Sequence, residues 1–177
     1  MPKKQATSKA KHNEAERSAR ATSASSHFDH RLEAAQRRIR ESVGQADTLE
    51  AVREIVTNLL GCEEIGLFTV KNGSSNLLWS FGIDTQRHGT LDSFDQSALK
   101  RVLQGEFHVV QMEGEQQADH PPLRVFVPIC RNGRTVAVLV MLKLLPQKVG
   151  FDQADLNLVK LLSQETGRAL FEESANA

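Results

Sequence analysis

Two cysteines, Cys62 and Cys130, are the residues of this sequence best suited to nucleophilic or redox chemistry. A pair of thiols can reduce a substrate when one attacks it and the other resolves the intermediate as a disulfide. Cys62 follows a predicted helix end at Gly61, and Cys130 precedes the turn of a predicted hairpin. Cysteines in such places are mostly small buried hydrophobic residues. We therefore predict a non-enzymatic chain with no catalytic residues.

Histidines are the next candidates, because they can hold a metal or a cofactor. His27 and His30 have the spacing of neighbours on a helix, but the sequence offers no evident third ligand. His88, His108 and His120 fall in or near predicted loops, where a lone histidine more often lies at the surface or makes a local hydrogen bond. We predict no metal site.

An apolar pocket is the remaining candidate site, since pockets combine apolar walls with a few polar anchors. Its predicted ligand-binding residues are Trp79, Phe81, Phe94, His108, Met112 and Arg124. They would enclose a space between a sheet and residues 82–122. The alternative that these residues only fill the core stays open, because aromatic residues in strands commonly serve that purpose.

The charges are divided unevenly along a chain whose formal net charge is zero. Residues 1–40 carry ten Lys and Arg against four Asp and Glu, and residues 41–177 carry twelve against eighteen. Residues 1–27 contain no large apolar residue after Met1, so they cannot offset the entropy of ordering, and we predict a disordered basic arm. Such an arm either solubilises the protein or binds a polyanion such as nucleic acid, which is the less favoured partner.

The predicted location of the protein in the cell depends on whether the sequence contains a membrane span or a secretory signal. The longest apolar run, around residues 136–145, is interrupted by Lys143 and is shorter than the roughly 20 residues that a membrane span needs. The start of the chain has no apolar stretch typical of a secretory signal. We predict a cytoplasmic protein that does not enter a membrane.

The elements that must position these residues begin with an amphipathic helix over residues 28–43. Its apolar residues recur at helical spacing in a narrow stripe, formed by Phe28, Leu32, Ala35, Ile39 and Val43. A stripe this narrow is closer to a seam between two helices than to a helix on a broad core. We therefore predict a homodimer through the terminal helices, with Phe28, Leu32, Ile39 and Val43 in its interface.

The rest of the chain predicts an α+β fold with an antiparallel sheet. The predicted elements are a helix from Asp47 to Leu60, strands over 65–70 and 77–81, a helix over 95–104, a strand over 107–110, a loop over 111–122, a hairpin of 123–130 and 134–142, and a helix over 152–172. Asn132-Gly133 favours a type I′ turn in the hairpin. In the strand after this turn, the side chains that point to either face are apolar, so this strand should be central in the sheet and covered on both faces. Strands in succession between helices place the N- and C-terminal helices on one face of the sheet and the pocket loops on the other.

The second half of the chain contains a characteristic series of residues along the predicted hairpin and the last helix. The hairpin contains Val127-Pro128-Ile129, Asn132-Gly133 and Val136-Ala137-Val138-Leu139, and Phe151, Asp155, Leu158, Leu162 and Ala169-Leu170 follow it. With the element order, this pattern resembles the GAF domain family over about residues 44–173. One departure is Ala137, where many members of the family have glycine. The chain then divides into a basic arm (1–27), an amphipathic helix (28–43), a GAF-like domain (44–173) and a tail (174–177).

GAF domains are ligand-binding and dimerising modules of signalling proteins. The resemblance therefore implies a sensory or regulatory domain, of the kind found in bacterial sensors, that binds a small ligand or a partner signalling protein. Two alternatives stay open. One is a protein–protein scaffold whose pocket is filled by its own side chains, and the other is a nucleic-acid-associated protein that uses the basic arm.

Because of this resemblance, the cofactors and reactions found in the family have to be considered for this chain. Some GAF-like proteins reduce free methionine sulfoxide with paired cysteines, which the placement of Cys62 and Cys130 does not suggest. Bilin-binding members need a linking cysteine in the pocket region, and residues 71–122 contain none. The sequence motif of cyclic-nucleotide-binding members is missing, and haem ligation by His88, His108 or His120 is not favoured. We predict no cofactor.

Overall fold

A five-stranded antiparallel sheet is the centre of the computed structural model, which describes residues 30–111, 123–146, 148 and 150–171. Its strands are β1 (Cys62–Lys71), β2 (Ser74–Phe81), β3 (His108–Gln111), β4 (Leu123–Arg131) and β5 (Arg134–Leu144), in the spatial order β2-β1-β5-β4-β3. The predicted α+β class with an antiparallel sheet is therefore confirmed.

β5 is central and buried on both faces. Ala137, Leu139 and Met141 belong to a core beneath the terminal helices, here called the helix-side core, whereas Val138 and Val140 belong to a second core under α4 (Gln96–Leu103), the α4-side core. Asn132 and Gly133 have φ values of 51° and 72°, which the predicted type I′ turn requires. The two predictions made for this hairpin are confirmed.

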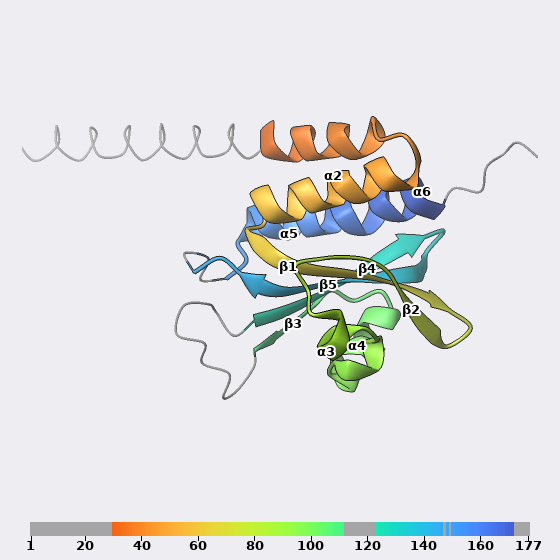
Figure 1. Ribbon diagram of the computed structural model, residues 1–177. Coiled ribbons are helices and arrows are strands. Elements are labelled where there is room, and N and C mark those ends of the chain that lie inside the picture. The colour runs from red at the N-terminus through yellow and green to blue at the C-terminus, as the bar shows by residue number, and fades with distance from the viewer. Residues whose placement is uncertain (1–29, 112–122, 147, 149, 172–177) are drawn as a thin grey trace, which may run out of the picture.

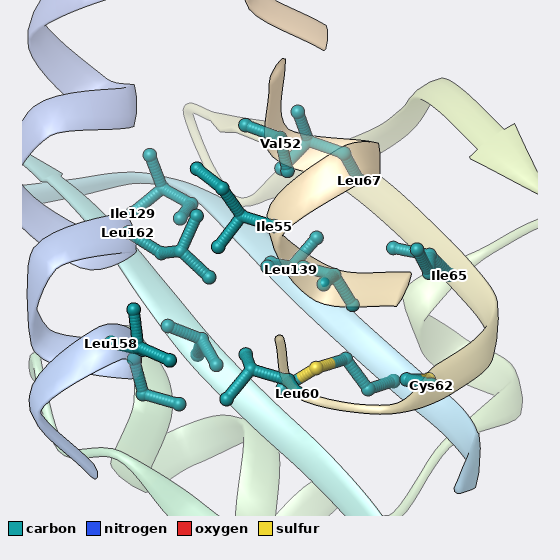
Figure 2. Packing of buried hydrophobic residues seen from close by; sticks show 14 of the residues in the cluster. Val52, Ile55, Leu60, Cys62, Ile65, Leu67, Ile129, Leu139, Leu158 and Leu162 are labelled. Carbon is teal, nitrogen blue, oxygen red and sulfur yellow. The ribbon is translucent and has the colours of Figure 1, made fainter. Parts of the chain in front are cut away.

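The terminal helices cover one face of the sheet, as expected. They are α2 (Gly44–Asn58) and a C-terminal helix made of α5 (Gln153–Leu161), a π-helical turn η2 (Leu162–Thr166) and α6 (Gly167–Phe171). Figure 1 shows α2, α5 and α6 on the same side of the sheet. Figure 2 shows Val52 and Ile55 of α2 packed with Leu158 and Leu162 over Leu139 of β5.

The start of α2 differs from the prediction. The helix begins at Gly44 and not at Asp47, and no side chain caps its first residues. The Asp47 carboxylate instead accepts hydrogen bonds from the Val43 N–H and from Arg38, each at 2.8 Å. The bond from Arg38 is the main reason that the pKa of Asp47 lies below its ordinary value. Asp47 therefore joins α2 to the preceding helix.

The C-terminal helix begins where the sequence predicts. Asp152 accepts a hydrogen bond from the Asp155 N–H at 2.8 Å, and Asp155 accepts one from the Asp152 N–H at 3.1 Å, so the two residues form a capping box. Further along, Gly167 lies against β4, where an added Cβ would approach the Cys130 carbonyl oxygen to 2.1 Å. Only glycine permits this close contact between helix and strand.

The opposite face of the sheet carries short helices. They are α3 (Thr85–His88), the 3₁₀ turn η1 (Leu91–Ser93) and α4. Residues 85–88, which lie outside the helices and strands predicted from the sequence, are thus helical, because the Asp84 carboxylate accepts hydrogen bonds from the N–H groups of Gln86 and Arg87. Asp95 caps α4 through the Ala98 N–H at 2.7 Å.

The first described helix covers residues 30–40 and is here called the N-terminal helix. Figure 1 shows it on the outer side of α2, away from the sheet. Ala35 and Ile39 are buried in the helix-side core, and Leu32 is partly buried against it. Arg38 binds Glu54 of α2 at 2.8 Å, and Arg40 binds Glu165 of η2 at 2.9 Å. These contacts fasten the N-terminal helix to its own chain.

This packing corrects the predicted dimer interface at one residue, Ile39. Ile39 is only 1% exposed, so the partner of this side chain is its own core and not a second subunit. Val43 is 85% exposed, and Phe28 lies outside the described residues, as do the predicted arm and tail. Of the three described residues, Ile39 and Val43 therefore do not belong to one exposed surface. The homodimer itself stays a prediction.

Among the described residues, no helix combines the length and the apolar content needed to span a membrane.

Candidate functional site

The space between the sheet and the short helices is filled by aromatic side chains. Phe68 of β1, Phe94 after η1 and Phe126 of β4, together called the phenylalanine cluster, are all buried. The Phe94 ring meets Phe68 edge to face at 5.9 Å between centroids and Phe126 at 5.8 Å. Both arrangements are favourable for aromatic pairs. The part of the predicted pocket position that described residues surround is thus occupied by the protein's own side chains.

His88, the last residue of α3, closes this cluster from the outside. It is buried, and its ring stacks on Phe94 with centroids 5.1 Å apart and an angle of 14° between the planes. The sequence marks His88 only as one of several loop histidines. The short helix that brings it over Phe94 depends on the Asp84 cap, a signal that the sequence does contain.

Two predicted pocket residues, Trp79 and Phe81, lie on the wrong face of the sheet. Trp79 stands opposite Leu67 and packs against the helix-side core, and the Arg53 guanidinium of α2 lies 5.1 Å from the Phe81 ring centroid. The cause is a bulge in the pairing of β1 with β2, between Leu67 and Phe68. One extra residue reverses the faces beyond it, so these side chains do not share a pocket with Phe94.

Three of the other predicted residues lie on the α4 side of the sheet. His108 stands opposite Phe126, and Arg124 stands opposite Val110, which packs against the α4-side core. Directly opposite residues of an antiparallel pair project to the same side of a sheet. His108, Arg124 and Phe94 therefore share the α4 side, whereas Met112 lies outside the described residues.

The cysteines are far apart. Cys62 is in register with Leu144 and Cys130 with Thr135, near opposite ends of β5. At the usual rise per residue this separation is roughly 30 Å, far above the Cα distance of about 7 Å that a disulfide tolerates. Burial raises the pKa of the Cys62 thiol to about 11, so the nucleophilic thiolate is suppressed.

A surface hollow of about 610 Å³ lies beside the first turn of α5. Its charged groups include Lys148 and Asp155, whose Nζ and Oδ1 atoms are 2.7 Å apart and which are largely buried. The Lys148 ammonium also lies 5.2 Å from the Phe151 ring centroid. This lysine is already paired within the protein. Across the described ranges, no group of three or more His, Cys, Asp or Glu side chains could hold a metal ion.

Comparisons with known proteins point to one fold. No protein-family model and no curated protein matches the sequence. Among solved structures, the GAF domain of an Acinetobacter phosphoenolpyruvate-protein phosphotransferase is 16% identical with a TM-score of 0.57, and the match covers 79% of this chain and 90% of that chain. The GAF domain of a two-component sensor histidine kinase from Bacillus halodurans is 14% identical with a TM-score of 0.56, over 73% and 95% of the two chains.

A type II free methionine-R-sulfoxide reductase from Thermoplasma acidophilum is also similar. It is 12% identical with a TM-score of 0.55, over 71% of this chain and 90% of that chain. At such identities the likeness concerns the fold and not the activity. Together with the sheet order and the two helical layers, these similarities establish that the chain has the fold of a GAF domain.

Proposed function

We propose that the chain is a non-enzymatic regulatory domain of cytoplasmic signal transduction. It acts as a homodimer, and its effect is exerted through contacts with a partner signalling protein. The GAF fold supports the general class, since two of the similar GAF domains belong to a sensor histidine kinase and a phosphotransferase. The phenylalanine cluster supports the choice of protein contact over a small ligand. A ligand in the predicted space between the sheet and the short helices would have to displace three packed rings.

Native mass spectrometry of the purified full chain tests this proposal. We expect the dimer mass without a stoichiometric small molecule, because the phenylalanine cluster leaves that space filled. A control spectrum under denaturing conditions gives the mass of the polypeptide alone. A small molecule retained at one copy per chain would overturn the filled-site proposal in favour of ligand sensing.

A reductase is the second candidate, favoured by the similarity to the free methionine-R-sulfoxide reductase. Such chemistry needs a reactive thiolate and, after attack, a second thiol within reach. Cys62 has a raised pKa, and Cys130 lies near the other end of β5. These observations argue against the candidate.

We expect the protein to reduce free methionine-R-sulfoxide no faster than buffer does when dithiothreitol is the reductant. The measurement is the product formed by the wild type, by Cys62→Ser and by Cys130→Ser, each shown to be folded by circular dichroism. Turnover by the wild type that either folded variant loses would contradict the non-enzymatic assignment.

A further inference from the structure

The two edges of the sheet differ in a way that matters for association. β3, at one edge, has four residues, whereas β2, at the other, has eight (Figure 1). An edge strand presents unpaired backbone N–H and C=O groups, and short length is one way in which proteins prevent edges from pairing. β3 has this protection and β2 does not.

The outer edge of β2 is uncovered in the described part of the chain. Among the described helices and strands, β1 alone packs extensively against β2. Beyond the β1 ladder, no backbone hydrogen bond within the described ranges reaches residues 74–81. The row of outward backbone groups is therefore available to another strand.

β2 also lacks the side chains that usually protect an edge. Its sequence, SSNLLWSF, contains no charged residue and no proline. Edge strands commonly carry lysine, proline or an inward-pointing charge to discourage pairing. Phe81 at its end is 40% exposed, although most phenylalanines are buried. This edge combines free backbone groups with partly exposed apolar side chains.

The turn before β2 shows which backbone groups point outward. Asn72 and Gly73 have φ values of 53° and 77°, so β1 and β2 are joined by a two-residue turn of the I′ kind. Lys71 and Ser74 form the closing pair of this hairpin. Because hydrogen-bonded and non-hydrogen-bonded pairs alternate along an antiparallel ladder, the N–H and C=O groups of Ser75 and Leu77 point away from β1.

We propose that a second copy of the chain pairs with this edge, with β2 lying antiparallel to β2 so that the two sheets become one continuous sheet. An uncharged strand can lie against itself without placing like charges opposite each other. It also has no charge with which to select an acidic or basic peptide. Pairing would bury both copies of Phe81 further and would close the long edges, leaving only the short β3 edges, so assembly stops at the dimer.

This inference rests on the homodimer of the proposed function and gives it a surface. The terminal-helix surface predicted from the sequence is less suitable, because Ile39 is buried within its own chain. β2 instead supplies a continuous strand, and none of its side chains is fully buried in the monomer.

Ser75→Pro tests the inference in the full chain. Proline removes the outward N–H and places a ring where the second strand would lie, but it leaves the β1 ladder bonds intact. Symmetry makes one substitution remove two donors from the dimer, so we expect self-association to weaken by about tenfold or more. Sedimentation equilibrium over a concentration series measures the change. Ser75→Ala keeps the N–H and is the matched control, for which we expect the wild-type dissociation constant.

Hydrogen exchange of the wild-type protein provides a second measurement that does not depend on a variant. The amides of Ser75 and Leu77 should exchange more slowly at concentrations where the dimer predominates than where the monomer does. If Ser75→Pro leaves the dimer intact, or if both amides stay unprotected in the dimer, pairing through the β2 edge is overturned. The proposed homodimer is not affected by either result. A wild type that stays monomeric at every concentration overturns the proposed homodimer as well.

Discussion

Ile39→Asp should destabilise the folded monomer by about 3–5 kcal/mol, the usual cost of a buried charge without a partner. Ile39 is 1% exposed and belongs to the helix-side core, so the new carboxylate would have no water around it. The chain can limit the cost by releasing the N-terminal helix, but it then loses the ion pairs of Arg38 and Arg40 and exposes apolar surface of α2. Chemical denaturation followed by circular dichroism measures the loss.

Val43→Asp is the matched control, because it adds the same charge to a side chain that is 85% exposed. Val43 is the N-cap residue of α2, where aspartate is favoured, so we expect the free energy of unfolding to fall by no more than about 0.5 kcal/mol. A large difference between the two variants supports packing within one chain. If Ile39→Asp were as stable as the wild type but lost self-association, the interface predicted from the sequence would be correct and the intrachain packing wrong.

Much of the fold could be predicted because its signals are local. Asn132-Gly133 forms the expected turn, and Asp95 and Asp152 cap the helices that follow them. The apolar residues on both faces of β5 also predicted its central position, since a strand without a polar face has to be covered on both sides. Each signal involves residues close in sequence, so no knowledge of distant partners is needed.

The position of Trp79 could not be predicted in the same way. Strict alternation places Leu77 and Trp79 on one face, but Leu77 stands opposite Phe68 and Trp79 opposite Leu67. The bulge that separates them is a property of the pairing with β1 and leaves no mark in β2 alone. An error of one residue in register moved two of the six predicted pocket residues, Trp79 and Phe81, to the other face of the sheet.

The N-terminal helix shows a different limit. Its apolar stripe is narrow because arginines flank it, and a narrow stripe is typical of a seam between subunits. In the structure Arg38 and Arg40 form ion pairs with Glu54 and Glu165 of the same chain. Long arginine side chains can cover apolar surface and extend the packed face of a helix. The width of the stripe therefore underestimated how much of the helix contacts its own chain.

The phenylalanine cluster gives the second large expected effect. Phe94→Ala should lower the free energy of unfolding by about 3–5 kcal/mol, the usual cost of truncating a buried aromatic residue. Phe94 is 4% exposed and contacts Phe68, Phe126 and His88, so its removal leaves a cavity walled by rings. An apolar cavity stays dry and accepts small apolar molecules. Benzene should therefore raise the melting temperature of Phe94→Ala and not that of the wild type.

Phe81→Ala is the control, because it removes the same ring from a site that is 40% exposed and contacts the Arg53 guanidinium. An exposed cation–π contact is worth about 0.5–1 kcal/mol, so this variant should lose far less stability. Chemical denaturation of both variants, with thermal melts in the presence and absence of benzene, distinguishes the two sites. Equal and small losses would mean that Phe94 does not seal this space in solution. In that case the α4 side of the sheet would be open to a natural ligand, and sensing by ligand binding would replace the filled scaffold as the better proposal.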